Sequence, residues 1–174
     1  MVNECLKPAA KGANNQGTEE VLYHCAYNFP AVILTLGDTS WIQLKPLHEK
    51  LVRDSRLKVR KTLAYSLFEL ASILGPQMTE SELVPVLFYF MKDVEEVREG
   101  VMASLPEFVA SLELIQRESY VEKFATAWVS GEESWRKRAM QVEQMGRLAS
   151  LFSPEVFAQH YCKEYFQFCE DQVA

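Results

Sequence analysis

Apolar residues recur every three or four positions along most of this chain, which is the pattern of helices that bury one face. The clearest stripe consists of Val59, Leu63, Leu67, Leu70 and Leu74, with polar side chains at most of the positions between them. Alternating runs rich in β-branched residues, which would indicate strands, are few. The pattern therefore predicts an all-α protein.

The stripes and the helix end signals divide the chain into successive helices. Helices are predicted over residues 18–36, 41–52, 59–74, 97–112 and 154–170. A further helix should begin at a capping box at 79–82 and end at a turn at 92–96. Residues 116–152 should form two helices on either side of a turn. Gly37 and Gly75 should end two of these helices, and Pro30 should bend the first. Ser153 followed by Pro154 is a typical helix start.

An internal repeat of 38 residues relates these helices, because Arg60, Arg98 and Arg136 follow one another at that interval. A period near 40 residues is typical of stacked helical hairpins, so we predict an α-α superhelix of the HEAT or armadillo kind. The fourth copy drifts, since Glu143 and Ser150 stand in apolar positions. Residues that recur identically one period later are Val21, Ala26, Tyr27, Leu36 and Gly37.

The repeat also sets the expected domain organisation. Residues 1–17 are polar, lack a period and should form a disordered N-terminal tail, whereas 18–174 should form one repeat domain. That domain would hold the second helix of a first unit (18–37), three units (40–75, 79–112 and 116–152) and the first helix of a last unit (154–170). Both ends then fall within a repeat, which predicts a fragment of a longer solenoid.

Composition and charge exclude several classes of function. The formal net charge of −6 disfavours nucleic acid and anionic membranes as partners, since both require a basic surface. The four cysteines form no CxxC pair, which suits a reducing compartment. The start of the chain lacks the apolar core of a signal peptide, and the longest apolar stretch, residues 83–91, is too short to span a bilayer. We expect a cytoplasmic protein, with the nucleus as an alternative location.

No motif indicates catalysis, a cofactor or a metal. His24, His48 and His160 lack a nucleophile at any recognised spacing. Cys25 occupies the repeat position of Leu63 and is predicted to be a packing thiol. The chain is therefore predicted not to be an enzyme. The rival hypothesis of an enzyme that uses His24 or Cys25 predicts a reactive Cys25 thiol.

Charged residues near the turns fall into two sets. An Asp in a turn and an Arg early in the following helix resemble the HEAT pattern in which such pairs stack into a ladder, here Asp54, Arg60, Asp93, Arg98 and Arg136. The remaining turn residues are not required by the repeat, so they are candidates for a partner-binding surface that we name the turn ridge. The turn ridge comprises Arg53, Ser55, Arg56, Lys58, Glu95, Glu96, Glu132 and Glu133.

Residues 22–30, 34–37, 61–66 and 91–101 carry a more specific resemblance, to the family of regulatory subunit 1 of protein phosphatase 4. These HEAT-repeat proteins are similar to the scaffold subunit of phosphatase 2A. The resemblance implies a non-catalytic regulator that binds a serine/threonine phosphatase catalytic subunit and positions phosphoprotein substrates or adaptors. In the related scaffold the turns grip the catalytic subunit, which would assign that role to the turn ridge. The alternative is a HEAT-repeat adaptor for transport or complex assembly that binds peptide on the concave face of its second helices.

Overall fold

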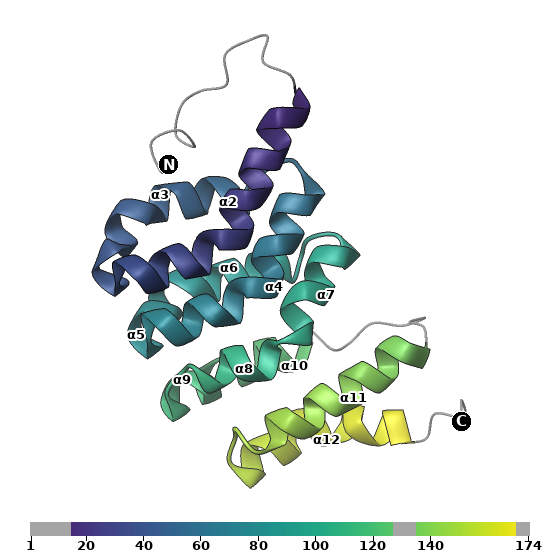
Figure 1. Cartoon of the computed structure of the whole chain (residues 1–174). Helices are drawn as coiled ribbons and strands as arrows, with labels where there is room; N and C mark the ends of the chain where they lie inside the picture. Colours follow the sequence, from purple (N-terminus) through teal and green to yellow (C-terminus); the bar gives the residue numbers. More distant parts are fainter. Residues whose placement is uncertain (1–14, 127–134, 170–174) are drawn as a thin grey trace. The chain divides into compact units, whose positions relative to one another are not determined.

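The computed structural model describes residues 15–126 and 135–169, and these residues form helices and connecting turns without a strand (Figure 1). The chain divides into two compact parts, one up to Met102 and one from Ala103 onwards. The predicted all-α class is confirmed. No helix among the described residues is both long and apolar enough to cross a membrane.

The N-terminal part is built from paired helices. In chain order these are α2 (Asn15–Leu36), the short η1 (Asp38–Ser40), α3 (Trp41–Val52), α4 (Leu57–Leu74), α5 (Pro76–Met78), the π-helical η2 (Thr79–Leu83), α6 (Val84–Phe90) and α7 (Glu95–Ala103). The long helices α2 and α4 pack against each other, and α3 packs against both (Figure 1). Helix α4 in turn contacts α6. Helices of neighbouring hairpins therefore lie in contact, as stacking requires.

The predicted apolar stripes form the core of the N-terminal part. Val59, Leu63, Leu67, Leu70 and Leu74 of α4 are all buried. The stripes predicted on the other helices are buried as well: Leu44, Leu47 and Leu51, then Leu83, Leu87 and Phe90, then Val97 and Val101. Helical periodicity therefore identified the packed faces of these hairpins correctly.

The repeat alignment predicts the buried face of α2 only in part. Val21 and Leu36 were aligned with the buried Val59 and Leu74, yet their side chains are 51% and 56% exposed. Helix α2 buries Leu22, Phe29 and Ile33, together with Ala26, whose repeat partner Ala64 is also buried. The main neighbours of α4 are α2, α3, α5, η2 and α6, whereas those of α2 are α3, α4 and η1. The same repeat position is thus less enclosed on α2.

Glycines end two helices as predicted, but two helix starts differ from expectation. Gly37 and Gly75 end α2 and α4 with φ of 84° and 78°, values that favour glycine. Helix α2 begins at Asn15 rather than at residue 18, contains Pro30, and changes direction along its length (Figure 1). The capping box at 79–82 is absent, because helix already begins at Pro76 and the Thr79 hydroxyl donates to the Ala71 carbonyl at 3.1 Å.

The C-terminal part contains shorter helices than the stripes predict. They are α8 (Leu105–Ala110), α9 (Leu114–Ser119), α10 (Val121–Thr126), α11 (Trp135–Ala149) and α12 (Pro154–Cys169). The helix predicted over 97–112 breaks at Ser104, since Pro106 has no N–H to continue the hydrogen-bond series. Helix α12 begins at Pro154 as predicted, and Ser153 donates to a Glu118 carboxylate oxygen at 2.9 Å.

The 38-residue alignment fails in the fourth copy. Trp135 should be buried like Val97, but it is 52% exposed. Glu143 and Ser150 are exposed too, so the drift seen in the sequence is a change of the buried face. Gln141, Gln144, Met145 and Leu148 face the core instead, because Met145, Leu148 and Phe152 form a local apolar stripe of their own. The expected tail at 1–17 lies outside the described residues, apart from its last three.

Candidate protein-binding surface

Arg60 joins two consecutive turns of the N-terminal part. Its Nε and Nη2 donate to the two carboxylate oxygens of Asp93 at 2.7 and 2.9 Å. Its Nη1 donates to the backbone carbonyls of Asp54 and Ser55 at 2.8 and 3.1 Å. The hydrogen bond from Arg60 holds the pKa of the Asp93 carboxyl below its usual value. One guanidinium therefore ties the turn after α3 to the turn after α6.

The other members of the predicted ladder have different places. The Asp54 carboxylate accepts from Nε and Nη2 of Arg56 at 2.7 and 2.6 Å, so it serves its own turn rather than a neighbouring unit. The hydrogen bond from Arg56 lowers the pKa of Asp54. Arg98 is half-buried on α7, and the side chain of Arg136 lies outside the described residues. Of the predicted ladder residues, Arg60 and Asp93 thus form an ion pair between two units.

The residues of the predicted turn ridge do not share one environment. Arg53, Ser55, Glu95 and Glu96 are exposed at the two turns that Arg60 joins. Arg56 is half-buried and forms an ion pair with Asp54. Lys58 belongs elsewhere, because its Nζ lies 3.9 Å from the ring centroid of Tyr23 on α2. Glu132 and Glu133 lie outside the described residues.

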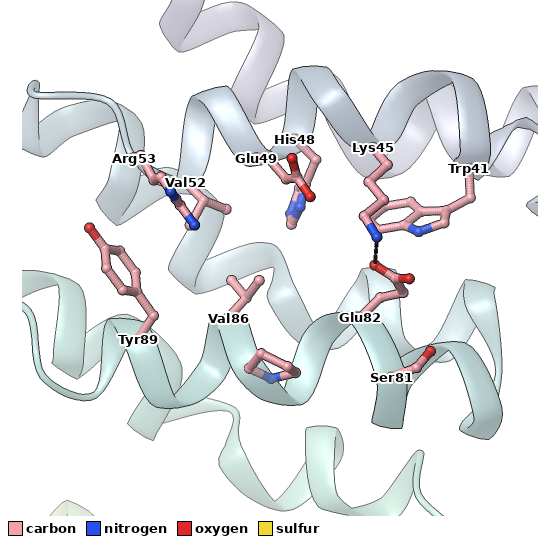
Figure 2. A pocket seen from close by; sticks show the side chains of 11 residues that line it. Trp41, Lys45, His48, Glu49, Val52, Arg53, Ser81, Glu82, Val86 and Tyr89 are labelled. Atoms are coloured by element: carbon pink, nitrogen blue, oxygen red, sulfur yellow. Dashed lines mark ion pairs between the residues drawn. The ribbon is translucent and has the colours of Figure 1, made fainter.

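A pocket of about 270 Å³ opens between α3 and α6 beside the turn ridge (Figure 2). Arg53 and Tyr89 lie at its turn end, and an ion pair of 2.7 Å between Lys45 and Glu82 lies at its other end. Sequence reasoning missed this pocket, because its lining residues lie beside the predicted apolar stripes of the two helices rather than on them. Its other lining residues are Trp41, His48, Glu49, Val52, Ser81, Pro85 and Val86.

The inner wall of this pocket is aromatic. The His48 ring lies 5.2 Å from the rings of both Trp41 and Phe29, measured between centroids. His48 Nε2 and Trp41 Nε1 are buried without a hydrogen-bond partner among the described residues. Burial lowers the pKa of His48 to about 4, so the imidazole is neutral at physiological pH. His48 thus acts as part of the packed wall.

A second and larger groove of about 650 Å³ lies between α2 and α4. It is lined by Tyr23, Tyr27, Asn28, Pro30, Ala31, Lys58, Lys61, Thr62, Tyr65, Ser66 and Glu69. The hypothesis of an adaptor pointed to this face of second helices, but it named none of these residues. A signal was present in the sequence, since Tyr27 and Tyr65 recur at the repeat interval on the side away from the core.

The rival enzyme hypothesis named His24 and Cys25, which are consecutive residues of α2. His24 is exposed and packs edge-on against Tyr23 at 5.2 Å between ring centroids. Cys25 is half-buried, so the prediction that it fills a core position like Leu63 is only partly met. No group of three potential metal ligands occurs among the residues that the structure describes.

Comparison with known proteins identifies the relatives of this chain. The family model of the protein phosphatase 4 regulatory subunit 1 middle domain matches residues 25–127. The human, mouse and rat proteins named serine/threonine-protein phosphatase 4 regulatory subunit 1 are each 39% identical over 156 residues. The matched segment covers 89% of this chain and 16% of each relative. Since the family model spans more than half of its residues, the chain belongs to the family of the protein phosphatase 4 regulatory subunit 1 middle domain.

Proposed function

We propose that this chain is a non-catalytic regulatory module that binds the catalytic subunit of serine/threonine phosphatase 4. The observation that carries the proposal is the family membership, together with two turns that Arg60 holds side by side. Its action is to hold the phosphatase near phosphoprotein substrates, which raises their effective concentration without chemistry by the module itself. The cytoplasm, with the nucleus as an alternative, is the proposed location.

The contact is proposed to centre on Arg53 and Tyr89. Both side chains are exposed beside the turns, and they flank the pocket between α3 and α6 (Figure 2). Arginine and tyrosine are enriched among residues that dominate binding energy, especially next to a hollow that receives a partner side chain. Glu95 and Glu96 supply the opposite charge at the next turn. A complementary partner would therefore present an acidic patch to Arg53 and a basic patch to Glu95 and Glu96.

The experiment measures binding of the purified phosphatase 4 catalytic subunit to the immobilised chain of 174 residues. Arg53→Glu should weaken this binding about tenfold, since it reverses a charge beside the proposed contact. Lys163→Glu, the same change at an exposed position of α12, is the matched control and should alter the affinity less than about twofold. Circular dichroism verifies that both variants are folded. Failure of the folded wild-type chain to bind, or equal affinities of both variants, would contradict the proposal.

A further inference from the structure

The groove between α2 and α4 has features that the proposed phosphatase contact does not use. Tyr27 and Tyr65 occupy equivalent positions on the two helices and are 64% and 44% exposed. Tyr23 lies beside Tyr27, with 6.2 Å between their ring centroids. Three tyrosine rings on one face form an apolar floor with polar edges, a surface type that is common in protein recognition.

Two lysines are positioned over this floor. The Nζ of Lys58 lies 3.9 Å from the ring centroid of Tyr23, and the Nζ of Lys61 lies 5.9 Å from that of Tyr65. A cation–π contact orients an ammonium group but leaves its charge and most of its N–H donors available. Within the described ranges neither lysine forms an ion pair with a carboxylate. Among the described residues that line the groove, Glu69 is acidic.

We propose that the α2–α4 groove binds an acidic peptide segment. Its carboxylate or phosphate groups would pair with Lys58 and Lys61, which lie three residues apart and therefore neighbour each other on α4. An apolar side chain of the peptide would lie on the rings of Tyr27 and Tyr65. The volume of about 650 Å³ suits a few residues of an extended chain, because well-formed ligand sites span a similar range.

Charge argues for a peptide rather than a nucleic acid. The chain carries a formal net charge of −6, and the groove is lined by Glu69 as well as by its two cations. Nucleic-acid surfaces require several phosphate contacts and a broader positive field. Two cations beside an aromatic floor match a short acidic motif better.

The test uses fluorescence anisotropy with the full chain and a fluorescein-labelled peptide of ten residues that carries four glutamates around a leucine–proline pair. Replacing those glutamates by glutamines, or two of them by phosphoserines, separates charge from shape and carboxylate from phosphate. Lys58→Gln combined with Lys61→Gln removes both cations, and Tyr27→Ala removes an exposed ring of the floor. Lys92→Gln combined with Lys163→Gln, at exposed lysines outside the groove, changes the net charge equally and is the matched control.

We expect the double variant at Lys58 and Lys61 to weaken binding of the glutamate peptide about tenfold, and the control pair less than about twofold. The glutamine peptide should bind about tenfold more weakly than the glutamate peptide. Equal losses in the two double variants, equal affinity for both peptides, absence of binding, or tighter binding of a labelled ten-nucleotide oligothymidine would each overturn the proposal. The variant at Lys58 and Lys61 should still bind the phosphatase catalytic subunit, so this inference and the proposed function can fail separately.

Discussion

Arg60 and Asp93 form a two-pronged ion pair, in which both carboxylate oxygens accept from one guanidinium across 33 residues of sequence. Their side chains are 15% and 12% exposed, so the pair is screened from water more than an ordinary surface ion pair. It can form only when the hairpin of α3 and α4 is stacked on the following one. The pair therefore reports on stacking between hairpins.

A double-mutant cycle of Arg60→Gln and Asp93→Asn should give a coupling free energy of about 1–2 kcal/mol in urea unfolding, between the values of surface and buried pairs. A matched cycle of Arg56→Gln and Asp54→Asn should give a smaller coupling, because that pair closes within one turn. Equal couplings would mean that the inter-unit pair adds nothing beyond a local contact.

Acid should destabilise the fold through His48. Its pKa in the folded state is about 4, whereas the unfolded chain has the ordinary value of 6.5, so the unfolded state takes up the proton first as the pH falls. The contribution of the neutral His48 ring to stability is therefore fully present above the unfolded pKa of 6.5 and is lost as the pH falls from there toward the folded pKa of about 4. Between pH 7 and pH 5 this loss should be about 2 kcal/mol, measured as the free energy of unfolding in urea.

His48→Gln provides the control for that measurement, because it removes the titrating ring. Its unfolding free energy should fall less between pH 7 and pH 5 than that of the wild type. If both proteins lose the same stability, carboxylates rather than His48 cause the acid sensitivity.

Gly100 should not tolerate a methyl group. A Cβ built there would lie 2.9 Å from Ala64 Cβ and 2.9 Å from Tyr65 Cδ2, on the neighbouring helix α4. Gly100→Ala should therefore destabilise the protein by about 1–3 kcal/mol despite the better helix propensity of alanine. Gly146 on α11 has no atom within 4 Å of its Cβ position, so Gly146→Ala should stabilise by about 0.5–1 kcal/mol. Thermal unfolding of the two variants should show shifts of opposite sign.

Leu67→Ala tests the register of the repeat. Leu67 is 1% exposed in the core stripe of α4, and its truncation should cost about 2–5 kcal/mol of unfolding free energy. Val21→Ala should change that free energy by less than about 0.5 kcal/mol, because Val21 is exposed although its repeat partner Val59 is buried. A large loss at Val21 would restore the face that the repeat alignment predicted for α2.

Periodicity predicted the hairpins, the stripes of α3, α4 and α6, and the glycine ends, because burial of one helical face dominates local sequence. It failed at Val21 and Trp135, since a repeat alignment assumes that every copy has the same neighbours. The place of Lys58 could not be predicted, because its contact with Tyr23 depends on how α2 lies on α4. The pocket beside Arg53 depends in the same way on the spacing of α3 and α6.

Gly37 and Gly75 have a mechanical consequence. Each connects one hairpin element directly to the next, without a loop that could open. The connection at Gly75 is restrained further, because the Thr79 hydroxyl donates a hydrogen bond to the Ala71 carbonyl on the other side of the glycine. Bending between these hairpins would then be distributed over many packed side chains rather than concentrated at one hinge.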